Sequence, residues 1–302
     1  WFERTAEVVE DEFDADNDAA NNEAPVAKLG DIWQLGNHRI ICGDSTDASV
    51  VSTLMQGEAA AMMWTDPPYG VNYVGKTKSA LTIQNDAVDE EALLDLLGRA
   101  WAAVQPCLVE SAPFYIAGPP GDHSYAFLRS FREAGWRFKQ ALVWRKNRMV
   151  MGRMDYHWQH ESVFFGLLPG RGGSRMGSPD EDTGVRRWYG DDRQTSVGDV
   201  DAPSVSEDHP TTKPVGIIRP FLVNSSQPGE VVLDPFAGSG STMIAAEQAG
   251  RRAYMVELDP RYVDVIVARW FAYQEEQQRA GALPVVEGQG ARADYGPGAF
   301  DA

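Results

Sequence analysis

Short apolar runs alternate with amphipathic segments along most of the chain. The runs have the length of buried strands, and they cover residues 38–43, 59–65, 113–120, 138–146 and 161–168, with two more that begin at Glu230 and Arg251. Apolar residues recur at helical spacing in residues 89–105, 124–135 and 213–226, and again after the last two runs. Strands that alternate with helices predict an α/β fold with a mainly parallel sheet. Few residues separate 138–146 from 161–168, so we expect these two strands to pair antiparallel.

Three segments depart from this alternation. Residues 1–24 hold nine acids against the single base Arg4, and we predict that residues 1–27 form an acidic, disordered linker. Residues 169–208 are rich in Gly, Ser and Asp with little periodicity, and so long a segment inside a domain is usually functional or disordered. Residues 276–302 are rich in Gly and Ala and are predicted to form a flexible tail.

The distribution of charge changes the expected partner. A net charge of −17 by itself argues against a nucleic-acid partner. Residues 129–153, however, carry eight bases against Glu133, and a basic stripe of this kind is what a surface that follows phosphates needs. A solvated face is the alternative interpretation. Within the stripe, the predicted DNA contacts are Arg145, Lys146 and Arg148.

Other sequence features indicate a cytoplasmic protein without a metal or a membrane partner. The only two cysteines, Cys42 and Cys107, have no metal-like spacing and argue against a disulfide framework. No apolar run reaches the roughly 20 residues that span a bilayer, and the first residues do not resemble a signal peptide. The segment His157–Glu161 matches neither HExxH nor HxxEH, so we interpret its histidines as structural or DNA-facing.

A glycine-rich loop, DPFAGSGST at residues 234–242, separates a predicted strand from a helix. Gly238 and Gly240 allow backbone to approach a ligand closely, and the helix that follows presents free N–H groups. The loop lacks the Lys of a phosphate-binding GxxxxGK loop and the full GxGxxG spacing. Asp234 and Phe236, at the end of the strand, suit a ligand that has an amino group and an apolar body.

An acid follows the next predicted strand. Glu257 lies 19 residues beyond Gly238, where a carboxylate in a doubly wound sheet receives two ribose hydroxyls. The alternative is a surface acid that caps the helix starting near Asp259. Together with the glycine loop, the spacing favours the ribose.

The stretch MMWTDPPYG, residues 62–70, ends an apolar run with an acid, two prolines and an aromatic ring. The side chain of Asp66 accepts hydrogen bonds, and Pro67 and Pro68 offer only carbonyl acceptors in a fixed loop. Tyr69 adds a flat face. These groups describe a socket for a planar ring with an exocyclic amino group, and a simple turn with proline at its corner is the alternative.

Together these motifs resemble a known family. Asp66–Tyr69 resembles the catalytic motif of amino-group DNA methyltransferases, and Asp234–Gly240 resembles their S-adenosylmethionine motif. The segment His209–Pro214, HPTTKP, resembles the stretch that precedes the cofactor motif in these enzymes. Because the catalytic motif comes first, the chain is similar to the circularly permuted beta class, including methylases of phages and prophages. The resemblance spans about Leu29–Tyr273.

This resemblance implies a Rossmann-like, S-adenosylmethionine-dependent methyltransferase fold, with a mainly parallel sheet, an antiparallel strand and the permuted motif order. It implies site-specific transfer of a methyl group to the N6 amino group of adenine in double-stranded DNA, by base flipping and direct in-line attack. In the family, Asp in the first motif is usual for adenine and Ser for cytosine, so Asp66 favours adenine. An N4-cytosine methyltransferase and a catalytically silent DNA-binding module of the same fold remain alternatives.

The resemblance also assigns residues. Residues 28–168 become the catalytic half, 169–208 the target-recognition region and 209–275 the cofactor-binding half. The implied catalytic residues are Asp66, Pro67, Pro68 and Tyr69. To the cofactor contacts above it adds Ser239, Asp44 (beside the cofactor adenine, or a helix cap), Thr212 and Lys213, which equally suits a phosphate. Arginines for guanine edges or phosphates are Arg171, Arg175, Arg186, Arg187 and Arg193. The recognition sequence cannot be read from these residues, and a homodimer is left open.

Overall fold

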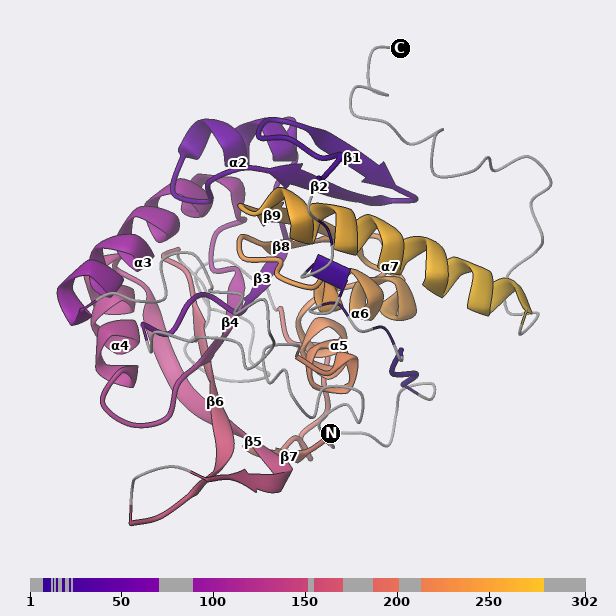
Figure 1. Ribbon diagram of the computed structural model, residues 1–302. Helices are drawn as coiled ribbons and strands as arrows, with labels where there is room; N and C mark the ends of the chain where they lie inside the picture. Colours follow the sequence, from indigo (N-terminus) through magenta and orange to yellow (C-terminus); the bar gives the residue numbers. More distant parts are fainter. Residues whose placement is uncertain are drawn as a thin grey trace.

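The structure, a computed structural model, describes residues 24–70, 89–151, 155–170, 187–200 and 213–279, together with residues 8–11, 13, 15, 18, 19 and 22. Within these residues a single nine-stranded sheet is covered by helices on both faces (Figure 1). Its strands are β1 (Ile32–Leu35), β2 (His38–Cys42), β3 (Met62–Thr65), β4 (Pro113–Gly118), β5 (Arg137–Val150), β6 (Trp158–Leu167), β7 (Val197–Asp199), β8 (Val231–Asp234) and β9 (Arg252–Glu257).

The helices pack in two layers. They are α2 (Ala48–Met55), α3 (Glu90–Val104), α4 (Ser124–Glu133), α5 (Val215–Ser225), α6 (Ser241–Ala249) and α7 (Pro260–Arg279), with the short 3₁₀ helix η1 (Gln105–Cys107) after α3. Helices α2, α3 and α4 share one hydrophobic cluster with the sheet, and α5, α6 and α7 share the other. In β3, Met62 and Trp64 belong to one cluster and Met63 to the other, because successive side chains point to opposite faces. Strands buried on both faces read as continuous apolar runs.

The strand order is β1-β2-β9-β8-β3-β4-β6-β5-β7. The five strands from β2 to β4 in this order run parallel, while β6 pairs antiparallel with both β4 and β5. The predicted α/β class and the predicted antiparallel pair are therefore confirmed. Parallel strands bring their carboxyl ends to one edge of a sheet, which is where ligands bind in such folds.

Two strands were not predicted. Strand β1 forms a hairpin with β2 through Gly36, whose φ is +58°. A Cβ at Gly36 would lie 2.9 Å from Cζ2 of Trp270 in α7, so a glycine lets this ring pack against the turn. Strand β7 is three residues long and pairs parallel with β5 at the outer edge. Both are too short to give a periodic signal, and β7 lies in the segment that we predicted to lack regular structure.

The acidic N-terminal segment departs from the linker prediction at its described positions. Ala15 and Ala19 are buried against Val265 of α7. The backbone N–H groups of Val26 and Ala27 donate to the Asp264 carboxylate at 2.7 and 3.0 Å. Composition could not reveal these contacts, because they depend on partners about 240 residues away. At the other end, α7 continues to Arg279, past the predicted start of the tail at residue 276.

Candidate active site

Four neighbouring parallel strands each lead into an acid at the same edge of the sheet. In the order β2, β9, β8 and β3, these acids are Asp44, Glu257, Asp234 and Asp66. Asp44 is exposed, Glu257 and Asp66 are half-buried, and Asp234 is fully buried. The predicted cofactor loop and the predicted catalytic motif therefore lie on adjacent strands, β8 and β3, although 168 positions separate Asp66 from Asp234 in the sequence.

Asp234 shapes the glycine loop through three hydrogen bonds. Its carboxylate accepts hydrogen bonds from Thr65 Oγ1 at 2.7 Å, Thr242 Oγ1 at 2.5 Å and the backbone N–H of Phe236 at 3.1 Å. Burial raises the pKa of Asp234 to about 6, even though the two hydroxyls favour the ionised form. These hydrogen bonds join β3 and α6 to the loop, and the ligand contact of Asp234 stays a prediction.

The two loop glycines have different roles. Gly240 has φ +80°, and a Cβ there would lie 2.9 Å from Ile266 Cγ1, so this glycine allows α6 to start close against α7. Gly238 has φ +52°, and a Cβ there would have no atom of the described residues within 4 Å, apart from its own residue and its two chain neighbours. Backbone at Gly238 is therefore accessible to a ligand. Behind the loop, Arg269 Nη1 donates to the carbonyl of Ser239 at 2.9 Å.

Glu257 is oriented toward this loop. Its Oε2 accepts from the N–H of Gly238 at 2.8 Å, and its Oε1 accepts from the N–H of Asp259 at 2.9 Å. Each oxygen keeps a further lone pair, which suits two hydroxyl donors. Burial raises the pKa of Glu257 to about 7. The helix-cap alternative applies instead to Asp259, whose Oδ1 accepts from the N–H of Arg261 at 2.9 Å.

Asp44 lies next to Glu257, because the N–H of Gly43 donates to the Glu257 carbonyl at 2.8 Å. Its side chain accepts from the N–H of Thr46 at 2.8 Å in the turn that follows β2. The N-cap of α2 is Asp47, so the helix-cap alternative for Asp44 is wrong.

Asp66 belongs to a cluster of two carboxylates and two ammonium groups. Tyr69 donates its hydroxyl to Asp66 Oδ1 at 2.8 Å, and Lys213 Nζ lies 2.7 Å from Asp66 Oδ2. Lys213 Nζ also lies 3.1 Å from Glu161 Oε2, while Lys146 forms a short ion pair with Glu161 Oε1. The charges in this cluster sum to zero, so it can be buried without an unpaired ion.

The neighbours in the cluster set its pKa values. Burial raises the pKa of Asp66, and the ammonium of Lys213 partly offsets that effect. Burial alone lowers the pKa of Lys213, but the carboxylates of Asp66 and Glu161 outweigh it and raise the pKa above its ordinary value. For Glu161, burial is outweighed by Lys213 and Lys146, and the pKa falls. Lys213 is therefore firmly charged.

Two predicted roles change here. Lys213 is 8% exposed and Lys146 12%, and both ammonium groups face the cluster, so neither reaches a phosphate. Glu161 was not among the predicted site residues. The predicted sheet could have indicated Glu161. Because β6 runs antiparallel to β4, the amino end of β6 lies at the same edge of the sheet as the carboxyl ends of β3 and β4, and Glu161 lies near that amino end.

The other predicted DNA contacts are scattered. Arg145 is exposed and pairs with Asp199 of β7 at 2.6 Å, and Arg187 pairs with Glu230 at 3.2 Å. Arg148 lies in the outer part of β5 and Arg193 in an exposed turn. Several predicted residues lie outside the described part of the chain: Thr212, Arg171, Arg175 and Arg186.

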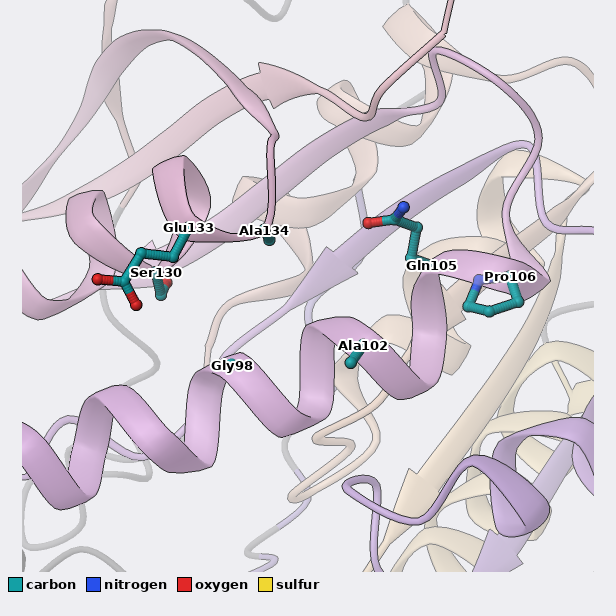
Figure 2. A pocket seen from close by; sticks show the side chains of 7 residues that line it. All are labelled: Gly98, Ala102, Gln105, Pro106, Ser130, Glu133 and Ala134. Atoms are coloured by element: carbon teal, nitrogen blue, oxygen red, sulfur yellow. The ribbon is translucent and has the colours of Figure 1, made fainter.

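A separate hollow of about 440 Å³ lies between α3 and α4 (Figure 2). Its lining includes Gln105 and Pro106, which precede β4, so it lies toward the amino ends of the strands and away from the acids.

Among the described residues, no three His, Cys, Asp or Glu side chains are grouped to hold a metal ion. None of the described helices combines the length and the apolar character of a membrane span.

Two curated relatives cover most of the chain. The protein YubD of Escherichia coli (strain K12) is 30% identical over 247 residues, which are 81% of this chain and 95% of YubD. The DNA adenine methyltransferase YhdJ of the same organism is 26% identical over 243 residues, 74% of this chain and 80% of YhdJ.

Solved structures share the fold. The DNA modification methylase TTHA0409 of Thermus thermophilus, in complex with S-adenosyl-L-methionine, superposes with a TM-score of 0.52 at 23% identity, covering 78% of this chain and 93% of that one. The PvuII DNA methyltransferase, which is cytosine-N4-specific, gives a TM-score of 0.56 at 13% identity. The superposition covers 83% of this chain and 96% of the PvuII enzyme.

The family model described as DNA methylase, of the N6/N4 amino-group type, matches residues 60–268, more than half of the chain. This span contains the Asp66 cluster, the glycine loop and Glu257. The chain therefore belongs to the N6/N4 family of DNA methylases.

Proposed function

We propose that the chain is a site-specific methyltransferase that acts on the N6 amino group of adenine in double-stranded DNA. The observation that carries this proposal is the position of Asp66. It is a half-buried carboxylate directly after β3, one strand from the glycine loop, and its orientation is fixed by Tyr69 and Lys213. A carboxylate so placed accepts a hydrogen bond from an amino group brought up to the cofactor.

The proposed cofactor is S-adenosyl-L-methionine, and the residues at the strand edge fit it. The open face of Gly238 admits it against the backbone, and the two oxygens of Glu257 each keep a lone pair for a ribose hydroxyl. Phe236 and Asp44 are the proposed contacts of its adenine. Asp44, Asp234 and Glu257 also suit the positive charge of a sulfonium, since they have no ammonium partner among the described residues. When bound, the cofactor supplies an activated methyl group, so the protein mainly aligns the reacting atoms.

Asp66 and Pro67 address the weakness of the target nucleophile. The lone pair of an adenine amino nitrogen is delocalised into the ring. Hydrogen bonds from this amino group to the Asp66 carboxylate and the Pro67 carbonyl draw the nitrogen toward tetrahedral geometry. The carboxylate also stabilises the positive charge that develops on the nitrogen during the transfer. Pro68 fixes the loop, and the ring of Tyr69 is the proposed stacking face for a base flipped out of the duplex.

An N4-cytosine methyltransferase is the second candidate, because cytosine also carries an exocyclic amino group that the same acceptors can bind. The PvuII enzyme shows that this fold serves cytosine. Asp at position 66 and the relative YhdJ favour adenine. A catalytically silent module is disfavoured, because a protein without chemistry has no need of a charged cluster at its ligand edge.

Transfer itself is tested with cofactor that carries a labelled methyl group and with bacterial DNA. Label is expected in acid-precipitable DNA, and more in duplex DNA than in heat-denatured DNA. DNA binding without any incorporation of label identifies the silent module and rejects the proposed activity.

We expect cofactor affinity to fall as the pH falls through about 7, the pKa to which burial raises Glu257. A carboxyl group accepts two hydroxyl hydrogen bonds fully only when ionised. Below its pKa, binding must release a proton, so Kd rises by up to about tenfold per pH unit. Calorimetry on the wild type and on Glu257→Gln checks this expectation. The variant should bind more weakly above the pKa and lose most of the pH dependence, and equal wild-type affinity on both sides of pH 7 contradicts the role of Glu257.

Exposed bases near the cluster are proposed to contact DNA phosphates. Replacing Arg145 and Arg148 together by Ala should weaken binding to all sequences alike and reduce the slope of log K against log salt by about 0.9 for each phosphate that the variant no longer neutralises. DNA affinity measured over a salt series checks this prediction. Arg99→Ala, an exposed arginine paired with Asp95 on α3, is the matched control. An unchanged slope in the double variant assigns these arginines to a solvated face.

A further inference from the structure

Two consecutive acids of the N-terminal segment contact two different supports of the site. Glu10 binds the start of α5: its Oε2 accepts from the N–H of Val215 at 2.9 Å and its Oε1 from the N–H of Gly216 at 2.6 Å. The N-cap residue of this helix is Pro214, which forms no side-chain cap. Glu10 therefore satisfies N–H groups that the helix itself leaves unpaired, and it places a negative charge at the positive end of the helix dipole.

The helix start that Glu10 holds also carries Lys213. Only Pro214, with its restricted φ, stands between Lys213 and the first helical residue. A Cβ at Gly216 would lie 3.0 Å from Glu10 Oε1, so a glycine at this position allows the close approach. A shift of the helix start moves the backbone that delivers the Lys213 ammonium to Asp66.

Asp11 contacts the other support. It forms a two-pronged ion pair with Arg269, with Asp11 Oδ2 to Nε and Asp11 Oδ1 to Nη2 both at 2.6 Å. Arg269 is 2% exposed, and its Nη1 donates to the Ser239 carbonyl at 2.9 Å and to Ser241 Oγ at 3.1 Å. Arg269 thus reaches the glycine loop from behind, and Asp11 neutralises a guanidinium that would otherwise be a buried, unpaired charge.

A third contact fixes the same short stretch. Gln248, at the end of α6, donates through Nε2 to the Val9 carbonyl at 2.7 Å. Residues 9–11 therefore contact α5, α6 and α7.

We propose that Glu10 and Asp11 are positioning residues for methyl transfer. Glu10 holds Lys213 at Asp66, and Asp11, through Arg269, holds the glycine loop in the conformation that binds the cofactor. This inference rests on the proposed roles of Asp66 and of the glycine loop. On this proposal, residues 9–11 of the acidic segment belong functionally to the catalytic domain.

The two acids should have separable effects. Asp11→Ala is expected to raise the cofactor Kd about tenfold, with kcat at saturating cofactor changed by less than about threefold. Glu10→Ala is expected to lower kcat about tenfold and to change the cofactor Kd by less than about threefold. Cofactor Kd comes from calorimetry, and kcat from label transfer to DNA, both well below the thermal midpoint of each variant.

A second comparison tests whether Asp11 acts through Arg269. In an Arg269→Met background, Asp11→Ala should have no additional effect on cofactor Kd, because no guanidinium remains to be held. Asp95→Ala, which removes an exposed partner of Arg99 on α3, is the control and should change neither constant.

The outcomes separate this inference from the proposed function. If the wild type binds the cofactor but transfers no methyl group, the proposed function fails, and the cofactor Kd of the Asp11 variants still decides the Asp11 part. Additive effects of Asp11→Ala and Arg269→Met on cofactor Kd overturn the link through Arg269. If Glu10→Ala and Asp11→Ala lower only the thermal midpoint, or change Kd and kcat in equal measure, the segment is merely structural and the inference is wrong.

Discussion

Replacing Asp66 by Ala should lower kcat for methyl transfer by on the order of 10³-fold, while cofactor affinity changes by less than about threefold. The carboxylate is the acceptor that polarises the target amino group, so its removal acts on the transition state. Within the described part of the chain, its side-chain partners are Tyr69 and Lys213, and neither belongs to the glycine loop. The cofactor should therefore bind the variant almost as well as the wild type.

Three measurements separate this expectation from a loss of structure. They are kcat at saturating cofactor and DNA, cofactor Kd by calorimetry, and the thermal midpoint. The midpoint is needed because, among the described residues, Asp66→Ala leaves Lys213 with Glu161 as its one remaining ion-pair partner. Asp95→Ala is the matched control: it removes an exposed acid that also pairs with a base. A loss of cofactor affinity as large as the loss of rate would show that Asp66 serves the cofactor and not the target base.

The second large effect is expected for Lys213→Met, which keeps the length of the side chain and removes its charge. Asp66 and Glu161 then face each other without the ammonium between them, and kcat should fall by about 10²-fold. Burial already raises the pKa of Asp66, and Lys213 offsets part of that rise. Without Lys213 the pKa of Asp66 rises further.

The sign of the pH effect follows from this change. The ionised carboxylate is the active form and is present above its pKa. A higher pKa means that activity is lost at a higher pH as the solution is acidified. The acid limb of the kcat profile should therefore move to higher pH in Lys213→Met relative to the wild type. An acid limb at the same pH in both proteins would remove Lys213 from its proposed role beside Asp66.

The main elements of the fold could be predicted from the sequence because strands buried on both faces leave continuous apolar runs, and helices leave a periodic pattern. The loops of the site could be located for a related reason. Asp66, Asp234 and Glu257 each lie at the end of such a run, and parallel strands bring run ends together.

What could not be predicted depends on contacts between distant positions. The sequence predicts a DNA contact for Lys146 and a cofactor or phosphate contact for Lys213. The pairing of β5 with β6 and the start of α5 bring these two side chains to Glu161 and Asp66. Glu10 and Asp11 read as part of a charge run, yet their partners lie more than 200 positions away, on α5 and α7. Composition describes how soluble such a segment is, and only the packed structure identifies its partners.

The most direct test of the account is mass spectrometry of the nucleosides from bacterial DNA that the wild type and Asp66→Ala have each methylated with isotopically labelled cofactor. The account predicts labelled N6-methyladenine from the wild type and essentially none from Asp66→Ala. Labelled N4-methylcytosine from the wild type would show that the target base is cytosine and not adenine. Equal yields of methyladenine from both proteins would contradict the central role of Asp66.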